Sequence, residues 1–153
     1  MVNRRDMQRL LMLAEFAEAL PGAGNARHAS PARVAAALFI KNQIIAVGHN
    51  QSRTCPFHAK YGKNPEAIFP HAETNVIKKA LSKIGYDELV SSKTTIYICR
   101  IKKTEARSGR FIWGLSKPCC GCVRALSEFK INRVVFTLDE DIRTQKEFEI
   151  WSK

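Results

Sequence analysis

Apolar residues recur at helical spacing near the start of the chain. From about residue 6 to residue 20, the positions that share one helical face are Met7, Leu10, Leu11, Ala14, Ala17 and Leu20. Asp6 can cap the start of this helix, and Pro21-Gly22 would end it. Because Glu15 and Glu18 interrupt the apolar run, the pattern predicts an amphipathic helix and not a secretory signal.

Two apolar runs that contain β-branched residues follow, over residues 34–40 and 44–47. They flank the turn-like Lys41-Asn42-Gln43 and therefore predict a β-hairpin with largely buried strands. Gly48 is expected to end the second strand and to open an irregular stretch that reaches residue 70. Loops longer than about 15 residues inside a compact domain usually have a functional reason.

The second half of the chain alternates between helical and strand patterns. The expected elements are a helix over 72–84 with Gly85 as its C-cap, a strand over 94–101, a basic insertion over 102–110, a helix over 119–129 and a strand over 134–138. Phe148-Glu149-Ile150-Trp151 could form a short last strand. No helix of useful length fits between Leu138 and Phe148, so such a strand would have an antiparallel neighbour.

Together these elements predict an α/β protein with three layers, α/β/α, and a mixed sheet of four to five strands. Residues 1–153 are expected to form a single domain, with an N-terminal helix at about 6–20 and a core at about 33–151. No apolar run approaches the ~18 residues of a membrane span, so no membrane partner is expected.

Composition adds a bias in charge. Lys and Arg number 25 against 14 Asp and Glu, which gives a formal net charge of +11. This excess favours an anionic partner, either a phosphorylated small molecule or a nucleic acid strand, although a generally basic surface explains it equally well. Of the five cysteines, three lie within four positions, which suits metal binding in a reducing compartment. Because neither a secretory signal nor a membrane span is predicted, a cytoplasmic location is expected.

The chemistry of the chain centres on two short motifs, His71-Ala72-Glu73 and Pro118-Cys119-Cys120-Gly121-Cys122. They match the H-x-E and P-C-x-x-C arrangement of zinc deaminases. Cys119 and Cys122 lie one helical turn apart, so both sulfurs can reach one ion together with His71. Three protein ligands leave the fourth position of Zn²⁺ for water, whose pKa zinc lowers to about 7.

Glu73 is the expected catalytic residue. It lies two positions past the histidine, so it need not bind the ion and can move protons between water, the ring nitrogen and the departing ammonia. A purely structural zinc site, or no metal, is the alternative, and Cys120 with Cys122 could also form the thiolate pair. The order of the motifs, each at a predicted helix start after a strand, favours a catalytic zinc site. The Pro-Cys start and the i, i+3 spacing favour Cys119 and Cys122 as the thiolates beside His71.

From Val34 to Leu138 the chain resembles the cytidine and deoxycytidylate deaminase superfamily. His71-Ala72-Glu73-Thr74-Asn75-Val76-Ile77 is similar to the H-A-E-x-N-A-I of deoxycytidylate deaminases, and Gly48-His49-Asn50 to their G-x-N. The resemblance implies a cytidine deaminase-like fold and one catalytic zinc ion. It also implies that Asn50 contacts the sugar or base and that the Ala72 amide contacts the base carbonyl. Ser52 replaces the second carboxylate of nucleoside deaminases, which argues against an unphosphorylated ribonucleoside.

The resemblance therefore implies a hydrolase that acts on the cyclic amidine C–N bond of a free nucleotide, converting dCMP to dUMP and ammonia. Arg53, three residues past Asn50, could hold the 5′-phosphate, and Lys117 could do the same. The expected partner is a small-molecule nucleotide, and the expected assembly is a homo-oligomer. A non-catalytic regulatory protein is a further alternative, which the presence of Glu73 disfavours.

A deaminase of cytosine or adenine in single-stranded DNA or RNA is the main alternative. Its support is a basic tract with nearby aromatic residues, since basic grooves with stacking rings hold single strands. These residues are Arg100, Lys102, Lys103, Arg107, Arg110, Phe57, Tyr61, Phe111 and Trp113. A separate hypothesis assigns a second metal to Cys55 and His58, although only these two ligands are evident.

Overall fold

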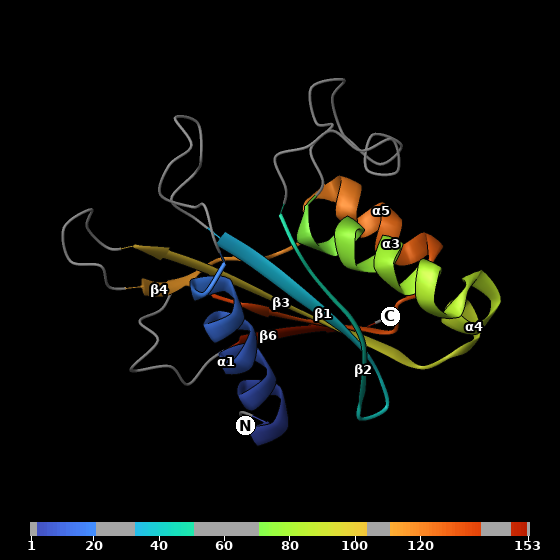
Figure 1. Cartoon of the computed structure of the whole chain (residues 1–153), viewed down its shortest axis with the longest axis horizontal. Helices are drawn as coiled ribbons and strands as arrows, with labels where there is room; N and C mark the ends of the chain where they lie inside the picture. The colour runs from blue at the N-terminus through green and yellow to red at the C-terminus, as the bar shows by residue number, and fades with distance from the viewer. Residues whose placement is uncertain (1–2, 21–32, 51–70, 104–110, 139–147, 153) are drawn as a thin grey trace.

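The computed structural model of the 153-residue chain describes residues 3–20, 33–50, 71–103, 111–138 and 148–152. The elements within these ranges are α1 (Arg4–Glu18), β1 (Arg33–Ile40), β2 (Gln43–His49), α3 (Ala72–Ile84), α4 (Tyr86–Ser91), β3 (Thr94–Lys103), β4 (Phe111–Gly114), α5 (Cys120–Glu128), β5 (Arg133–Thr137) and β6 (Phe148–Ser152). Figure 1 shows α1 on one face of the sheet and α3 with α5 on the other. The predicted α/β/α arrangement is confirmed.

The strands form one mixed sheet in the order β2-β1-β3-β5-β6, and β4 pairs with β3 outside this order. β3 and β5 are parallel, with α5 in the connection between them, and all other strand pairs are antiparallel. The five strands of the main order agree with the predicted four to five. β6 does run antiparallel to β5, as the short connection requires.

Two elements of the structure have no counterpart in the prediction. The four residues of β4 are too few to show an alternating pattern, and they pair with the part of β3 beyond its contact with β5. The six-residue α4 follows Gly85, which ends α3 with a φ of 80° as its predicted C-cap role requires. β2 continues to His49, one residue past the predicted end at Gly48.

The alternation of side chains along β3 divides the core into two halves. Ile96 and Ile98 are fully buried with Val76 and Leu126 of the helices α3 and α5. Tyr97, Cys99 and Ile101 face the opposite side, where α1 covers them. Because successive residues of a strand point to opposite faces, every second residue of β3 belongs to the half of the core that carries α3 and α5.

The role predicted for Asp6 was wrong. Asn3 caps α1, accepting hydrogen bonds from the backbone amides of Arg5 at 2.9 Å and Asp6 at 3.4 Å. The Asp6 side chain is 1% exposed and forms an ion pair with Arg133 of β5, and the Tyr97 hydroxyl donates a hydrogen bond to it at 2.6 Å. Asp6 thus anchors α1 to two strands rather than capping it.

Candidate active site

The predicted motifs lie at the N-termini of two neighbouring helices. His71 is the N-cap residue of α3, and its carbonyl accepts hydrogen bonds from Asn75 N at 3.0 Å and from Thr74 Oγ1 at 3.1 Å. Cys119 is the N-cap residue of α5, and its sulfur accepts a hydrogen bond from the backbone amide of Cys122 at 3.5 Å. Helix N-termini carry a partial positive charge, which favours thiolate over thiol at this place.

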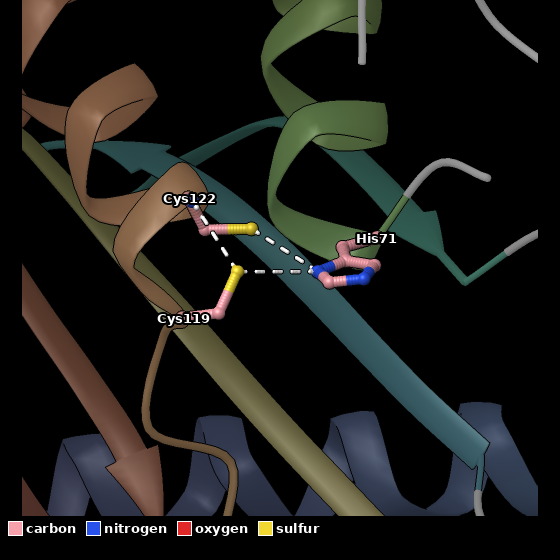
Figure 2. Close-up of side chains that lie close together, drawn as sticks. All are labelled: His71, Cys119 and Cys122. Carbon is pink, nitrogen blue, oxygen red and sulfur yellow. Dashed lines mark hydrogen bonds between the residues drawn. The ribbon is translucent and has the colours of Figure 1, made fainter. Parts of the chain in front are cut away.

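The three predicted metal ligands converge on one point (Figure 2). His71 Nδ1 lies 3.6 Å from Cys119 Sγ and 3.4 Å from Cys122 Sγ, and all three ligand atoms lie within 4.8 Å of one another. A tetrahedral ion with Zn–S bonds of about 2.3 Å and Zn–N bonds of about 2.0 Å separates nitrogen and sulfur ligands by about 3.5 Å. The observed distances fit one zinc ion.

The three ligand groups are coupled electrostatically through their hydrogen bonds. Hydrogen bonds with Cys122 and His71 lower the pKa of the Cys119 thiol to about 3. The hydrogen bond between His71 and Cys119 raises the pKa of the His71 imidazole. A second hydrogen bond, between Cys122 and Cys119, raises the pKa of the Cys122 thiol, and burial of this thiol raises it further. One imidazole and two cysteine sulfurs are a donor set suited to Zn²⁺, which binds them with release of the protons that His71 and Cys122 hold.

Cys120 does not take part in this cluster. It is the first residue of α5 and is exposed, whereas Cys122 is buried toward α3. Within the part of the chain that the structure describes, the group that could hold a metal consists of His71, Cys119 and Cys122. The geometry therefore favours Cys119 over Cys120 as the second thiolate.

Glu73 lies beside the ligand cluster without belonging to it. Its side chain is 5% exposed, in the first turn of α3. Burial raises the pKa of the Glu73 carboxyl, while a hydrogen bond with the Cys122 thiol and the charge of His71 oppose this rise. A carboxyl group with a raised pKa that lies close to a metal site is suited to taking up and releasing protons.

A cavity of about 300 Å³ opens next to the cluster. The described residues that line it are Val34, Asn50, His71, Ala72, Glu73, Arg100, Leu115, Ser116, Lys117 and Cys119. Several of these are site residues expected from the sequence, whereas Arg100 is there part of the basic tract of the nucleic-acid hypothesis. The alternation along β3, which puts Arg100 on the same side as Ile98, is the signal that could have assigned it to the site.

Hydrogen bonds between the β5 end and the segment before Cys119 hold one wall of the cavity. Ser116 Oγ donates to the Ile98 carbonyl at 2.9 Å, and the Thr137 amide donates to Ser116 Oγ at 2.9 Å. The Thr137 hydroxyl donates to the Gly114 carbonyl at 2.7 Å. These buried contacts fix the path of the chain into Pro118 and Cys119. Nothing local in the sequence indicated them.

Asn50 and Ala72, the predicted substrate contacts, both line the cavity. Asn50 exchanges two hydrogen bonds with Val34: its amide donates to the Val34 carbonyl, and its Oδ1 accepts from the Val34 amide, both at 3.1 Å. Arg53 lies outside the described residues, as do Cys55 and His58 of the second-metal hypothesis.

Of the two aromatic residues of the nucleic-acid hypothesis that the structure describes, Trp113 is buried and Phe111 is partly buried. Trp113 is 0% exposed and belongs to the core beneath α1. Phe111 packs at the edge of the same core, with the Arg33 guanidinium 5.4 Å from its ring centroid. Phe57, Tyr61, Arg107 and Arg110 lie outside the described residues. Trp113 therefore cannot provide a stacking surface.

Comparison with known proteins gives one family match. Residues 13–138 match the family described as cytidine and deoxycytidylate deaminase zinc-binding region. Two structures of the dCMP deaminase from the cyanophage S-TIM5 are similar at 16% identity. The apo form has a TM-score of 0.48 over 92% of this chain and 88% of that one, and the complex with dCMP and dUMP has 0.47 over 88% and 81%. No curated protein matches.

Proposed function

Because the chain belongs to the cytidine and deoxycytidylate deaminase zinc-binding family, we propose that it is a hydrolytic deaminase of a free nucleotide, with dCMP as substrate. The reaction consumes water and yields dUMP and ammonia. One observation carries the proposal: a single cavity is lined by Glu73 and two of the zinc ligands and also by the cationic side chains of Arg100 and Lys117. The cavity thus combines the reacting groups with charges that suit a phosphate.

The size of the cavity supports a small substrate. Pockets for small molecules typically enclose about 300–1,000 Å³, and about 300 Å³ lies at the lower end of this range. A single nucleotide matches such a volume.

The residues around the cavity have distinct roles in this proposal. Zinc bound by His71, Cys119 and Cys122 would supply a Lewis acid that makes water nucleophilic near neutral pH. Glu73 takes a proton from the attacking water and delivers it to the ring nitrogen N3. It then takes the second proton, from the hydroxyl group added at C4, and passes it to the amino group, which leaves as ammonia while the C4 carbonyl forms. Its buried position beside the ligands, but outside their cluster, supports this role.

Two further residues would orient the nucleotide. The Ala72 amide belongs to the first turn of α3, where backbone N–H groups have no acceptor within the helix, so it can donate to the carbonyl of the base. Asn50 uses its Oδ1 for the Val34 amide, so its Nδ2 is the group that can donate to the sugar or the base.

The substrate is tested by ammonia release from the purified, zinc-loaded chain. Separate reactions contain dCMP, dCTP, cytidine, guanine and a single-stranded oligonucleotide that contains cytosine and adenine. We expect the highest kcat/KM with dCMP. The net charge of +11 favours the oligonucleotide as the second candidate, and turnover of the oligonucleotide without turnover of any mononucleotide would contradict the proposal.

A further inference from the structure

Arg100 is a charged residue on the side of β3 that faces the core. Its neighbours two and four positions earlier, Ile98 and Ile96, are fully buried beneath α3 and α5. Arg100 pairs with Val34 of β1 on one edge of β3 and with Gly114 of β4 on the other. Since alternate residues share a face, its side chain extends toward the helices, where the cavity lies.

The chain provides a defined place for this side chain. A Cβ atom at Gly114 would lie 3.0 Å from Arg100 Cδ and 3.1 Å from its Cγ, so the alkyl part of Arg100 lies directly against the bare backbone of Gly114. The Arg100 amide donates to Thr137 Oγ1 at 3.2 Å, and that hydroxyl in turn donates to the Gly114 carbonyl. Backbone and side chain are therefore both positioned by β4 and β5.

The guanidinium group has no anionic partner among the residues that the structure describes. The cavity lining contains one carboxyl group there, Glu73, and that group lies beside the metal ligands. The other cation of the lining, Lys117, is exposed. A half-buried guanidinium that lines a cavity binds oxyanions strongly, because its planar fork of donors matches phosphate oxygens in pairs.

From these contacts we infer that Arg100 binds the 5′-phosphate of the nucleotide and is the residue that selects nucleotide over nucleoside. The inference rests on the proposed function, since it assigns the substrate of that same cavity. Gly114 has a positioning role, because any side chain there would displace Arg100. No group is transferred at this site, so the contact acts on binding and not on the chemical step.

Equilibrium binding of the product dUMP, compared with that of deoxyuridine, which lacks the phosphate, tests this inference without turnover. Isothermal titration calorimetry would compare the zinc-loaded full chain with Arg100→Gln, Arg100→Lys and Gly114→Ala. Arg5→Gln, which removes the same charge from an exposed position of α1, is the matched control. Circular dichroism melts confirm that each variant is folded.

We expect Arg100→Gln to weaken dUMP binding about 10–100-fold, the effect of losing hydrogen bonds to a charged group, and to change deoxyuridine binding less than about twofold. The affinity of Arg100→Lys for dUMP should lie between those of the wild type and Arg100→Gln. Gly114→Ala should weaken the binding of dUMP but not that of deoxyuridine. Arg5→Gln should change neither affinity. Equal losses for dUMP and deoxyuridine in Arg100→Gln would overturn the inference, as would a wild type that binds both ligands equally.

The inference and the proposed function can fail separately. In one case the wild-type protein releases no ammonia from dCMP, but Arg100→Gln weakens the binding of dUMP and not of deoxyuridine. This result would support the phosphate site and refute the proposed dCMP deaminase activity. In the other case the wild-type protein deaminates dCMP, and neither Arg100→Gln nor Gly114→Ala changes kcat/KM. This result would support the proposed activity and refute the role of Arg100.

Discussion

Glu73 and its two neighbours in space, His71 and Cys122, have different roles. Glu73 provides a carboxyl group for proton transfer, whereas His71 and Cys122 are metal ligands. The carboxyl group is buried beside the ligands but is not one of the three that converge. The roles can therefore be separated by changing the carboxyl group alone.

Glu73→Gln keeps the size of the side chain and removes its capacity to carry a proton. We expect kcat for dCMP to fall about 10²–10⁴-fold, the usual contribution of a general acid or base. Zinc content, measured by plasma mass spectrometry, should stay at one ion per chain. Loss of the metal in this variant would mean that Glu73 serves the zinc site structurally.

Gly48 is the residue of β2 that allows α3 to approach the sheet. A Cβ atom there would lie 2.5 Å from Asn75 Oδ1 and 2.9 Å from Val76 N. Asn75 can shift only by giving up the hydrogen bond that its Oδ1 accepts from the His49 amide at 3.2 Å. The close contact with the backbone of α3 remains in any case.

Gly48→Ala should therefore lower the free energy of unfolding by about 1–3 kcal/mol, the usual cost of overpacking. Denaturant titration followed by circular dichroism measures it. Gly114→Ala is a suitable control, because the Cβ atom there meets the flexible side chain of Arg100 instead of backbone. An equal loss of stability in both variants would contradict the steric explanation.

At the scale of elements, a buried charge cluster attaches α1 to the sheet. Asp6 of α1 pairs with Arg133 of β5 and accepts a hydrogen bond from Tyr97 of β3. Arg9, one turn further along α1, donates to the Tyr97 hydroxyl at 2.9 Å and lies 3.9 Å from the centroid of the Phe39 ring. Burial alone would raise the pKa of Asp6, but the hydrogen bonds with Arg133 and Tyr97 outweigh it and lower the pKa.

Asp6→Asn should lower the free energy of unfolding at pH 7 by about 1–3 kcal/mol, because it leaves the Arg133 and Tyr97 donors poorly paired. A carboxyl group with a lowered pKa stabilises the fold above its unfolded pKa of about 3.9, and this contribution is lost as the pH falls through the folded value. Denaturant titrations should thus show the difference from wild type shrinking below about pH 4.

The same chemical change at Asp87, which is exposed in α4, is the matched control for this prediction. Asp87→Asn should alter the free energy of unfolding by less than about 0.5 kcal/mol at either pH. A difference between Asp6→Asn and wild type that stays constant from pH 7 to pH 3 would contradict the assigned ion pair.

At the scale of the whole molecule, one metal site connects the two helices on the same face of the sheet. His71 belongs to the start of α3, whereas Cys119 and Cys122 belong to the start of α5.

Within the described part of the chain, no helix is long and apolar enough to cross a membrane. The single domain and the homo-oligomer remain predictions.

Removal of zinc by a chelator should lower the melting temperature of the chain and abolish turnover. A ligand that binds only the folded state stabilises it by about 4 kcal/mol at 1,000 times its Kd. Cys119→Ser should lose both zinc and this stabilisation, whereas Cys120→Ser should keep one zinc ion per chain. Two zinc ions per chain would instead support the second-metal hypothesis for Cys55 and His58.

Local patterns in the sequence were sufficient for most elements and for the identity of the metal ligands. Helices repeat every 3.6 residues and strands every two, so apolar spacing predicts β1, β2, β3, β5, α1, α3 and α5 without knowledge of their neighbours. Cys119 and Cys122 lie within one turn of each other, and the motif that includes His71 is equally local. The family resemblance then implied that these distant motifs meet.

Only the tertiary structure decided which residues surround that meeting point. His71 and Cys119 lie 48 positions apart, and their 3.6 Å separation depends on how α3 and α5 pack on one sheet. The packing of α1 on the opposite face turned Asp6 from a predicted cap into an anchor and buried Trp113. The side of β3 that carries α3 and α5 directs Arg100 into the cavity. Pairing between distant segments is determined by burial and by complementary charges, and neither can be read from the spacing of residues along the chain.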